Sequence, residues 1–203
     1  DYERGEQTER KAESALLQVL AIDSGNARAE TELAWTRIRL AGMLMGQKKY
    51  EAANRMFDQS ITKARALRER EPTRTAHAKM LAIALQSSAL PLRLTGKSAE
   101  AVARYIEAEQ IWSVFVAEAT GDNEALEDLA TCRRFLATHY RDEKQLDLAE
   151  TYASKSHLVF ESLAGDAPSD IGRQRDLQES HSLLGSIARD RKDYETALTE
   201  YQA

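Results

Sequence analysis

The residues that could do chemistry in this chain are its four histidines, its one cysteine and its paired acidic residues. The histidines are His77, His139, His157 and His181. They show none of the spacings, such as His-Glu-x-x-His, that place two ligands on one face of a helix. Glu127-Asp128 and Asp142-Glu143 fall at an expected helix start and turn, where negative charge favours the fold itself. We therefore expect no catalytic centre, metal or cofactor, and no enzymatic activity.

The remaining reactive side chains are better explained by packing. Cys132 shares a column of small residues with Thr36, Ala84 and Ser180, and free cysteine is among the most buried residue types. We expect His181 to have a packed or half-buried role in the core in preference to binding a metal. A single cysteine cannot form an internal disulfide, which favours a reducing compartment such as the cytoplasm.

The elements that position these residues repeat every 48 residues. One column is leucine and another is alanine: Leu33, Leu81, Leu129 and Leu177, then Ala53, Ala101, Ala149 and Ala197. A third column, of small residues, holds Ala41, Ala89, Ala137 and Gly185. Unrelated columns with one period indicate a repeat array.

Each repeat reads as a pair of helices. Leu33, Leu40 and Leu44 lie on one helical face, the segment 46–49 breaks the pattern, and a longer apolar stripe follows from Tyr50. The expected first helices are 27–46, 75–94, 123–142 and 170–190. The expected second helices are 2–21, 48–70, 98–118, 144–164 and 192–203.

The helix stops and starts use turn residues. Pro72, Gly121 and Pro168 should end second helices, because proline cannot continue a helix and glycine suits the left-handed position after one. Asp122 or Asn123, and Ser169 or Asp170, are candidate N-caps for the helices that follow.

We therefore expect a single array over residues 1–203, cut from a longer protein. It would comprise a half repeat (1–21), three full repeats (27–70, 75–118 and 123–164) and a partial repeat (170–203). Unpaired apolar stripes at such open ends, as at Ala197 and Tyr201, could support end-to-end self-association.

Composition agrees with an all-α fold and limits the partners. Only three prolines and nine glycines occur, and no alternating β-branched run predicts a strand. The net charge of −5 argues against nucleic-acid binding, which relies on basic patches. No apolar run approaches the roughly 18 residues of a membrane span.

These residues resemble the tetratricopeptide repeat. The likeness lies in the Leu-small pair (Leu40-Ala41, Leu184-Gly185), the alanine of the second helix (Ala53) and the aromatic after it (Phe57). The common repeat has about 34 residues, so this period of 48 is long. The resemblance implies an α-α superhelix in which the first helices line a concave groove that binds peptides. The repeat style also resembles arrays that follow kinase domains in some large bacterial proteins.

Transferred by register, the resemblance gives a set of groove residues. They are Trp35, Ile38, Arg39, Gln86, Arg93, Arg134, Phe135, Thr138, Arg141 and Arg189. The mixture of aromatic residues and arginines would suit a peptide with apolar and acidic side chains. Arg93, Arg141 and Arg189 recur with the period, and they could form a basic stripe or only interact with the last carbonyls of their helices.

The expected function is that of a protein-interaction scaffold, with a peptide or partner helix held in the groove. The alternative is a regulatory or sensory array in a bacterial signalling protein, joined to a kinase or a transcription regulator. A helical-repeat enzyme is a third class, which the absence of an acid–base or ligand cluster in the sequence disfavours.

Overall fold

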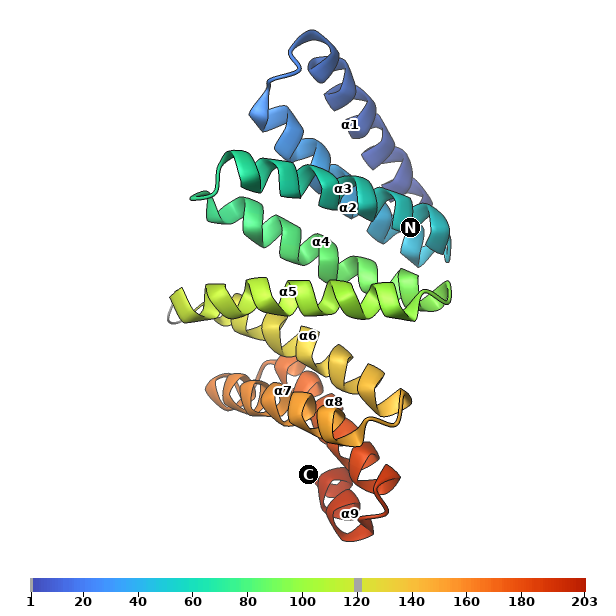
Figure 1. Ribbon diagram of the computed structural model, residues 1–203, viewed down its shortest axis with the longest axis vertical. Coiled ribbons are helices and arrows are strands. Elements are labelled where there is room, and N and C mark those ends of the chain that lie inside the picture. Colours follow the sequence, from blue (N-terminus) through green and yellow to red (C-terminus); the bar gives the residue numbers. More distant parts are fainter. Residues whose placement is uncertain (1, 119–121) are drawn as a thin grey trace. The chain divides into compact units, whose positions relative to one another are not determined.

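The computed structural model describes residues 2–118 and 122–203, and within them it contains α-helices and no strand (Figure 1). The helices are α1 (Tyr2–Ile22), α2 (Ala27–Gly46), α3 (Tyr50–Arg70), α4 (Thr75–Leu94), α5 (Ser98–Glu118), α6 (Asn123–Asp142), α7 (Leu146–Asp166), α8 (Ile171–Asp190) and α9 (Tyr194–Gln202). Every expected helix is present, and each end lies within two residues of its expected position. The all-α repeat fold predicted from the periodicity is confirmed.

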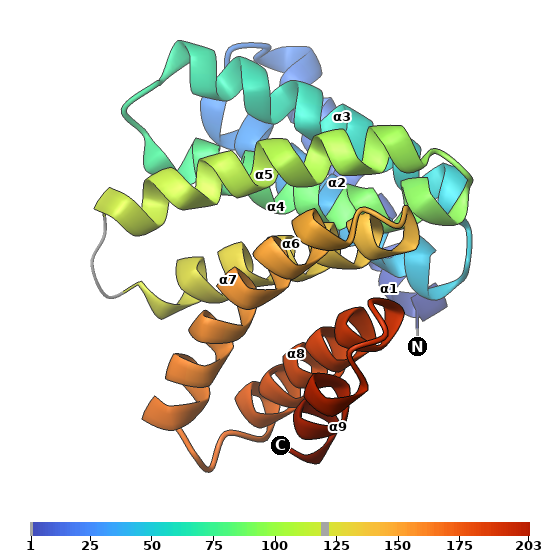
Figure 2. The ribbon, with the colours of Figure 1, turned by 60° about the horizontal axis from the view of Figure 1, so that its bottom comes forward.

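The helices cluster into two compact units, residues 1–111 and 112–203. In the first unit α1 packs on α2, α2 on α3 and α3 on α4, while α2 also touches α4. In the second unit α6 packs on α7, α7 on α8 and α8 on α9, while α6 also touches α8. Figure 2 shows the α8–α9 hairpin at the C-terminal end of the second unit. Each unit is thus a stack of helix hairpins whose first helices meet.

The turn from each first helix to the next second helix has one conformation. Its central residue has a left-handed backbone, at Lys48 (φ 60°), Gly96 (φ 80°), Lys144 (φ 62°) and Lys192 (φ 67°). After α2, the Lys48 N–H donates to the Met45 carbonyl, and the Lys49 N–H donates to the Leu44 carbonyl, both at 2.9 Å. The same two bonds close α4, α6 and α8. This is the Schellman arrangement, which satisfies carbonyls at a helix end.

The opposite connections are fixed by N-caps. The side chains of Asn26, Asp122 and Asp170 accept backbone N–H bonds at the starts of α2, α6 and α8. Asp122 and Asp170 were candidates from the sequence. Arg74 occupies this position before α4 and makes no side-chain cap. Gly121, expected to end the preceding helix, lies outside the described residues.

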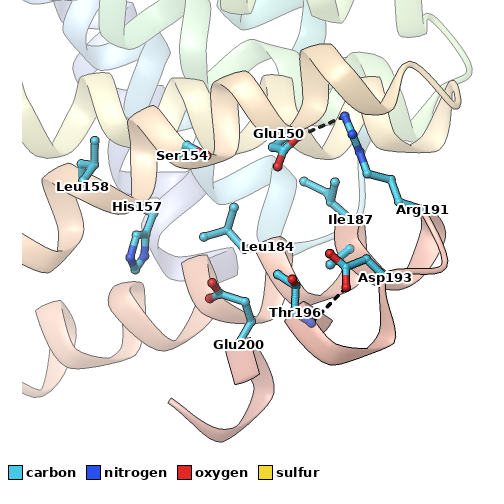
Figure 3. Close-up of a pocket in the computed structure, with 11 residues that line it drawn as sticks. Glu150, Ser154, His157, Leu158, Leu184, Ile187, Arg191, Asp193, Thr196 and Glu200 are labelled. Carbon is cyan, nitrogen blue, oxygen red and sulfur yellow. Dashed lines mark hydrogen bonds and ion pairs between the residues drawn. The ribbon is translucent and has the colours of Figure 1, made fainter. Parts of the chain in front are cut away.

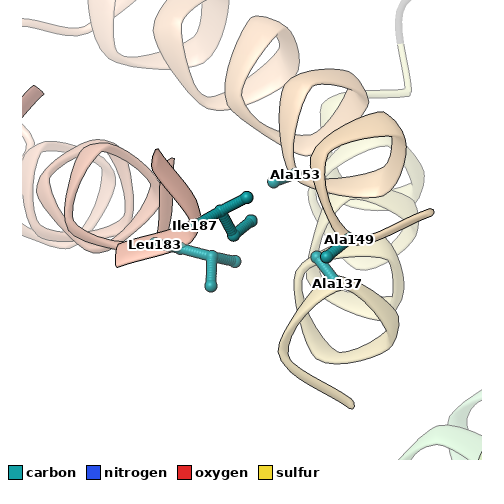
Figure 4. Packing of buried hydrophobic residues seen from close by; sticks show 5 residues of the cluster. All are labelled: Ala137, Ala149, Ala153, Leu183 and Ile187. Atoms are coloured by element: carbon teal, nitrogen blue, oxygen red, sulfur yellow. The ribbon is translucent and has the colours of Figure 1, made fainter. Parts of the chain in front are cut away.

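The core is built from the repeating columns. All four residues of the alanine column are buried, as are Phe57 and Tyr105 beside it. In the second unit Ala137, Ala149 and Ala153 pack with Leu183 and Ile187 in one cluster (Figure 4). Small residues on α6 and α7 thus face large ones on α8.

The small-residue column explains one glycine. A Cβ at Gly185 would lie 2.8 Å from Cε1 of Tyr201, so a larger residue would displace this ring from its position against α8. The Tyr201 hydroxyl also lies 3.1 Å from Ser186 Oγ. Even so, Tyr201 is 48% exposed, in contrast to the buried Phe57 and Tyr105 at the same repeat position.

Candidate functional site

A cavity of about 270 Å³ lies between the first helices α6 and α8 of the second unit. We call it the α6–α8 cavity. It is lined by Arg134, Phe135, Thr138, Glu179 and Leu183. The first three were expected in a binding groove from the repeat register, and the structure places them together. Its walls therefore combine an aromatic ring, an aliphatic side chain and a charged pair.

Arg134 is held by neighbours on three helices. Its guanidinium pairs with Glu179 and lies 3.8 Å from an oxygen of Asp176, both on α8. Its Cζ atom is 5.8 Å from the ring centroid of Phe135 and 5.6 Å from that of Phe160 on α7. A cation over an aromatic face is attracted by the ring quadrupole. Arg134 thus joins α6, α7 and α8, and much of its charge is compensated within the protein.

Two of the periodic arginines meet at one carboxylate. Arg141 Nε lies 3.8 Å and Arg189 Nη2 lies 3.6 Å from oxygens of Asp190. Lys144 Nζ is 4.0 Å from the same side chain, and Arg141 also pairs with Asp142 at 3.3 Å. Three cations therefore share two carboxylates beyond the ends of α6 and α8.

The groove residues predicted in the first unit are more dispersed. Ile38 is buried, at 9% exposed, so it packs in the core and does not face outward as expected. Arg39 reaches α1, where its Nε lies 3.0 Å from Glu9 Oε1. Trp35 on α2, and Gln86 and Arg93 on α4, are half-buried. A cavity of about 360 Å³ in this unit is lined by other residues of α2 and α3, including Arg37, Asp58 and Thr62.

A second cavity, of about 410 Å³, lies among α7, α8 and α9 (Figure 3). We call it the α7–α9 cavity. Its apolar lining is Leu158, Leu184, Ile187 and Ala188, and its polar lining is Glu150, Ser154, His157, Arg191, Asp193, Thr196 and Glu200. Sequence reasoning missed this site. A signal was nevertheless present in the sequence. Ser154 and Glu200 stand 96 residues after Asp58 and Arg104, which form an ion pair in the first unit, and they replace this pair of opposite charges.

Two histidines stand at one side of the α7–α9 cavity. The rings of His157 and His181 lie 4.5 Å apart between centroids, at 66° to each other. His157 Nδ1 is 3.0 Å from Ser180 Oγ, and His181 Nδ1 is 2.8 Å from Glu200 Oε2. Burial lowers the pKa of His157, and the nearby His181 lowers it further by a smaller amount. His157 is therefore a neutral wall residue at pH 7. His181 is half-buried as predicted.

The other reactive residues have structural surroundings. Cys132 is fully buried, in agreement with its expected packing position. His139 is half-buried and its ring lies 5.5 Å from that of Tyr140. Within residues 2–118 and 122–203, no group of three His, Cys, Asp or Glu side chains could hold a metal ion. In the same residues, no helix has the length and apolar character needed to cross a bilayer.

The fold is similar to that of a solved protein. The crystal structure of BtubC (BKLC) from P. vanneervenii matches with a TM-score of 0.56 and 13% sequence identity. The match covers 100% of this chain and 89% of that chain. At this identity, the likeness shows a shared fold alone. No family model matches the chain, and no curated protein matches it.

Proposed function

We propose that the chain is a tetratricopeptide-like interaction module that binds a peptide or partner helix across its first helices, without covalent chemistry. The observation that carries the proposal is the α6–α8 cavity, because Arg134, Phe135 and Thr138 were expected there from the register and line it together. A groove that offers a ring and an aliphatic wall beside fixed charges suits an apolar anchor of a partner. The single buried cysteine supports a cytoplasmic location for this module.

The charges beside the cavity support a partner with acidic side chains. Arg134 is already compensated by Glu179, so the apolar anchor would enter there. Arg141, Lys144 and Arg189 outnumber the carboxylates that they contact, and Arg189 is well exposed. An arginine binds a carboxylate through two parallel hydrogen bonds, which gives orientation as well as affinity. An acidic residue of the partner would thus lie along α8, beyond the anchor.

The test is selection of binders from a random peptide library, followed by fluorescence anisotropy with variants. Phe135→Ala should raise the Kd of selected peptides by about tenfold or more, since buried aromatic anchors contribute about 2 kcal/mol at such sites. Leu148→Ala, on α7 and outside both cavities, is the matched control and should leave Kd unchanged. Circular dichroism checks that both variants are folded. Equal affinities for the Phe135 variant and the parent would refute the site.

The acidic preference has a separate test. Arg189→Gln should weaken a selected acidic peptide several-fold and reduce the salt dependence of its Kd, because one exposed cation is removed. A peptide in which Asp and Glu are replaced by Asn and Gln should bind the parent and the Arg189 variant with the same Kd. If the neutral peptide binds as tightly as the acidic one, the preference is wrong while the apolar site stands.

A further inference from the structure

The α7–α9 cavity has an internal counterpart in the first unit, two repeats earlier in the sequence. Glu150 of α7 contacts Arg191 at 3.0 Å, beyond the end of α8 (Figure 3). At the same two repeat positions, Asn54 of α3 donates a hydrogen bond to Thr95 Oγ1 at 3.3 Å, beyond the end of α4. The shared contact shows that the positions are equivalent in space as well as in sequence.

The two units differ at the next pair of positions. In the first unit Arg104 of α5 binds Asp58 of α3 at 2.5 Å, so an ion pair bridges consecutive second helices. The Arg104 side chain is 17% exposed there. In the second unit the same positions hold Ser154 and Glu200, and both line the open cavity. The place of a cation in one unit is thus taken by a carboxylate in the other.

This exchange leaves the cavity with an excess of negative charge. Three carboxylates, those of Glu150, Asp193 and Glu200, line it with one guanidinium, that of Arg191. Glu200 uses Oε2 for His181, and a carboxylate has about four acceptor positions, so it can accept further donors. Asp193 accepts the Thr196 N–H at 3.1 Å as the cap of α9. The floor of Leu184 and Ile187 is apolar.

We infer that the α7–α9 cavity binds a basic side chain, arginine above all, from a partner polypeptide. The aliphatic stem of arginine would lie on Leu184 and Ile187, and its guanidinium would meet Glu200. The guanidinium of the partner would then take the position that corresponds to Arg104 in the first unit, where the chain itself provides the cation. The site faces second helices, so it is separate from the α6–α8 cavity and from the function proposed for it.

The test is a residue-resolved NMR titration of the whole chain with the blocked tripeptide acetyl-Leu-Arg-Leu-amide. The same tripeptide with citrulline at its centre is the control, since citrulline keeps the shape of arginine without its charge. Saturable shifts should appear in the amides of α7 from residue 150 to 158 and of α9 from residue 193, with the citrulline peptide about tenfold weaker or more. Equal binding of both peptides would overturn the inference, as would shifts confined to other helices.

Two variants make the test specific. Glu200→Gln should weaken the arginine peptide about tenfold, while Glu195→Gln, an exposed change on the same helix, should leave it unchanged. The double variant Ser154→Asp with Glu200→Arg should rebuild the bridge of the first unit, remain folded and lose binding. Retained binding in a folded double variant would contradict the proposed position. Free arginine binding as tightly as the tripeptide would show a small-cation site and refute a polypeptide partner.

Discussion

Exchanging lysine and glycine at the left-handed turn position should change stability in opposite directions in the two units. Lys144 and Gly96 occupy the same place in the Schellman turn, with φ of 62° and 80°. A residue with a Cβ is disfavoured there by about 1–2 kcal/mol, whereas glycine loses about 0.5–1 kcal/mol more conformational entropy on folding. The difference favours glycine by about 1 kcal/mol. Lys144→Gly should therefore stabilise the chain, and Gly96→Lys should destabilise it by a similar amount.

The surroundings add little to this difference. A Cβ built at Gly96 meets no atom within 4 Å, so the substitution creates no clash. The Lys144 side chain is 77% exposed, and its Nζ lies 4.0 Å from Asp190. A solvated ion pair of this kind contributes little to stability. The backbone conformation thus decides the sign at both positions.

Urea unfolding followed by circular dichroism would measure the effect as a shift of midpoint at constant slope. Lys144→Ala is the control, because it removes the ammonium group and keeps the Cβ, so its stability should match that of the parent. The reasoning fails if Lys144→Ala gains as much as Lys144→Gly. It also fails if Gly96→Lys unfolds at the same urea concentration as the parent.

Three further predictions concern helix ends, ion pairs and packing. Arg74→Asp should supply the cap that α4 lacks and stabilise by about 1 kcal/mol, and an unchanged thermal midpoint would contradict this. A hydrogen bond from Lys63 lowers the pKa of Glu30 below its ordinary 4.5. The ionised Glu30 therefore stabilises the folded chain above that pH, and this contribution is lost as the pH falls and the carboxylate is protonated. When the pH is lowered from neutral to acidic, the free energy of unfolding should fall less for Glu30→Gln than for the parent. Denaturation of both proteins at the two pH values measures this difference. Ala101→Leu should overpack a buried crossing and cost about 1–3 kcal/mol, and parent-like stability would refute the register.

The periodicity was sufficient to predict the helices and their core columns. Close packing of the two helices of a repeat requires a small residue, such as Ala101, at the same position each time. This requirement appears in the sequence as a column with a constant spacing. The left-handed turn was harder, because lysine is an unusual residue there and only Gly96 signals the conformation. The segment 46–49 was recognised as a break, but not its backbone geometry. Burial of Ile38 was missed because a helical register does not show how far a neighbouring helix extends over its face.

The partners of the cavity residues could not be predicted, because they lie on helices that are not consecutive in sequence. Arg134 was placed in the groove by register, yet its partners Asp176 and Glu179 lie one hairpin later, and no local pattern reveals that its charge is compensated. The same limit applied to Glu200. In the sequence it looks like an ordinary surface residue of α9. Whether it forms an ion pair or lines a cavity depends on the residue of α7 that faces it.

The repeat itself supplies the comparison that a single sequence otherwise lacks. Equivalent positions share a backbone environment, so a difference between them isolates the effect of the side chain. Arg104 and Glu200 occupy one such position with opposite charge, and one lies in an ion pair while the other lines a cavity. Packing requires the small and aliphatic columns to be kept, whereas positions facing the gap between second helices can change charge without loss of the fold. Departures from the period at such positions are therefore where binding sites can arise in this chain.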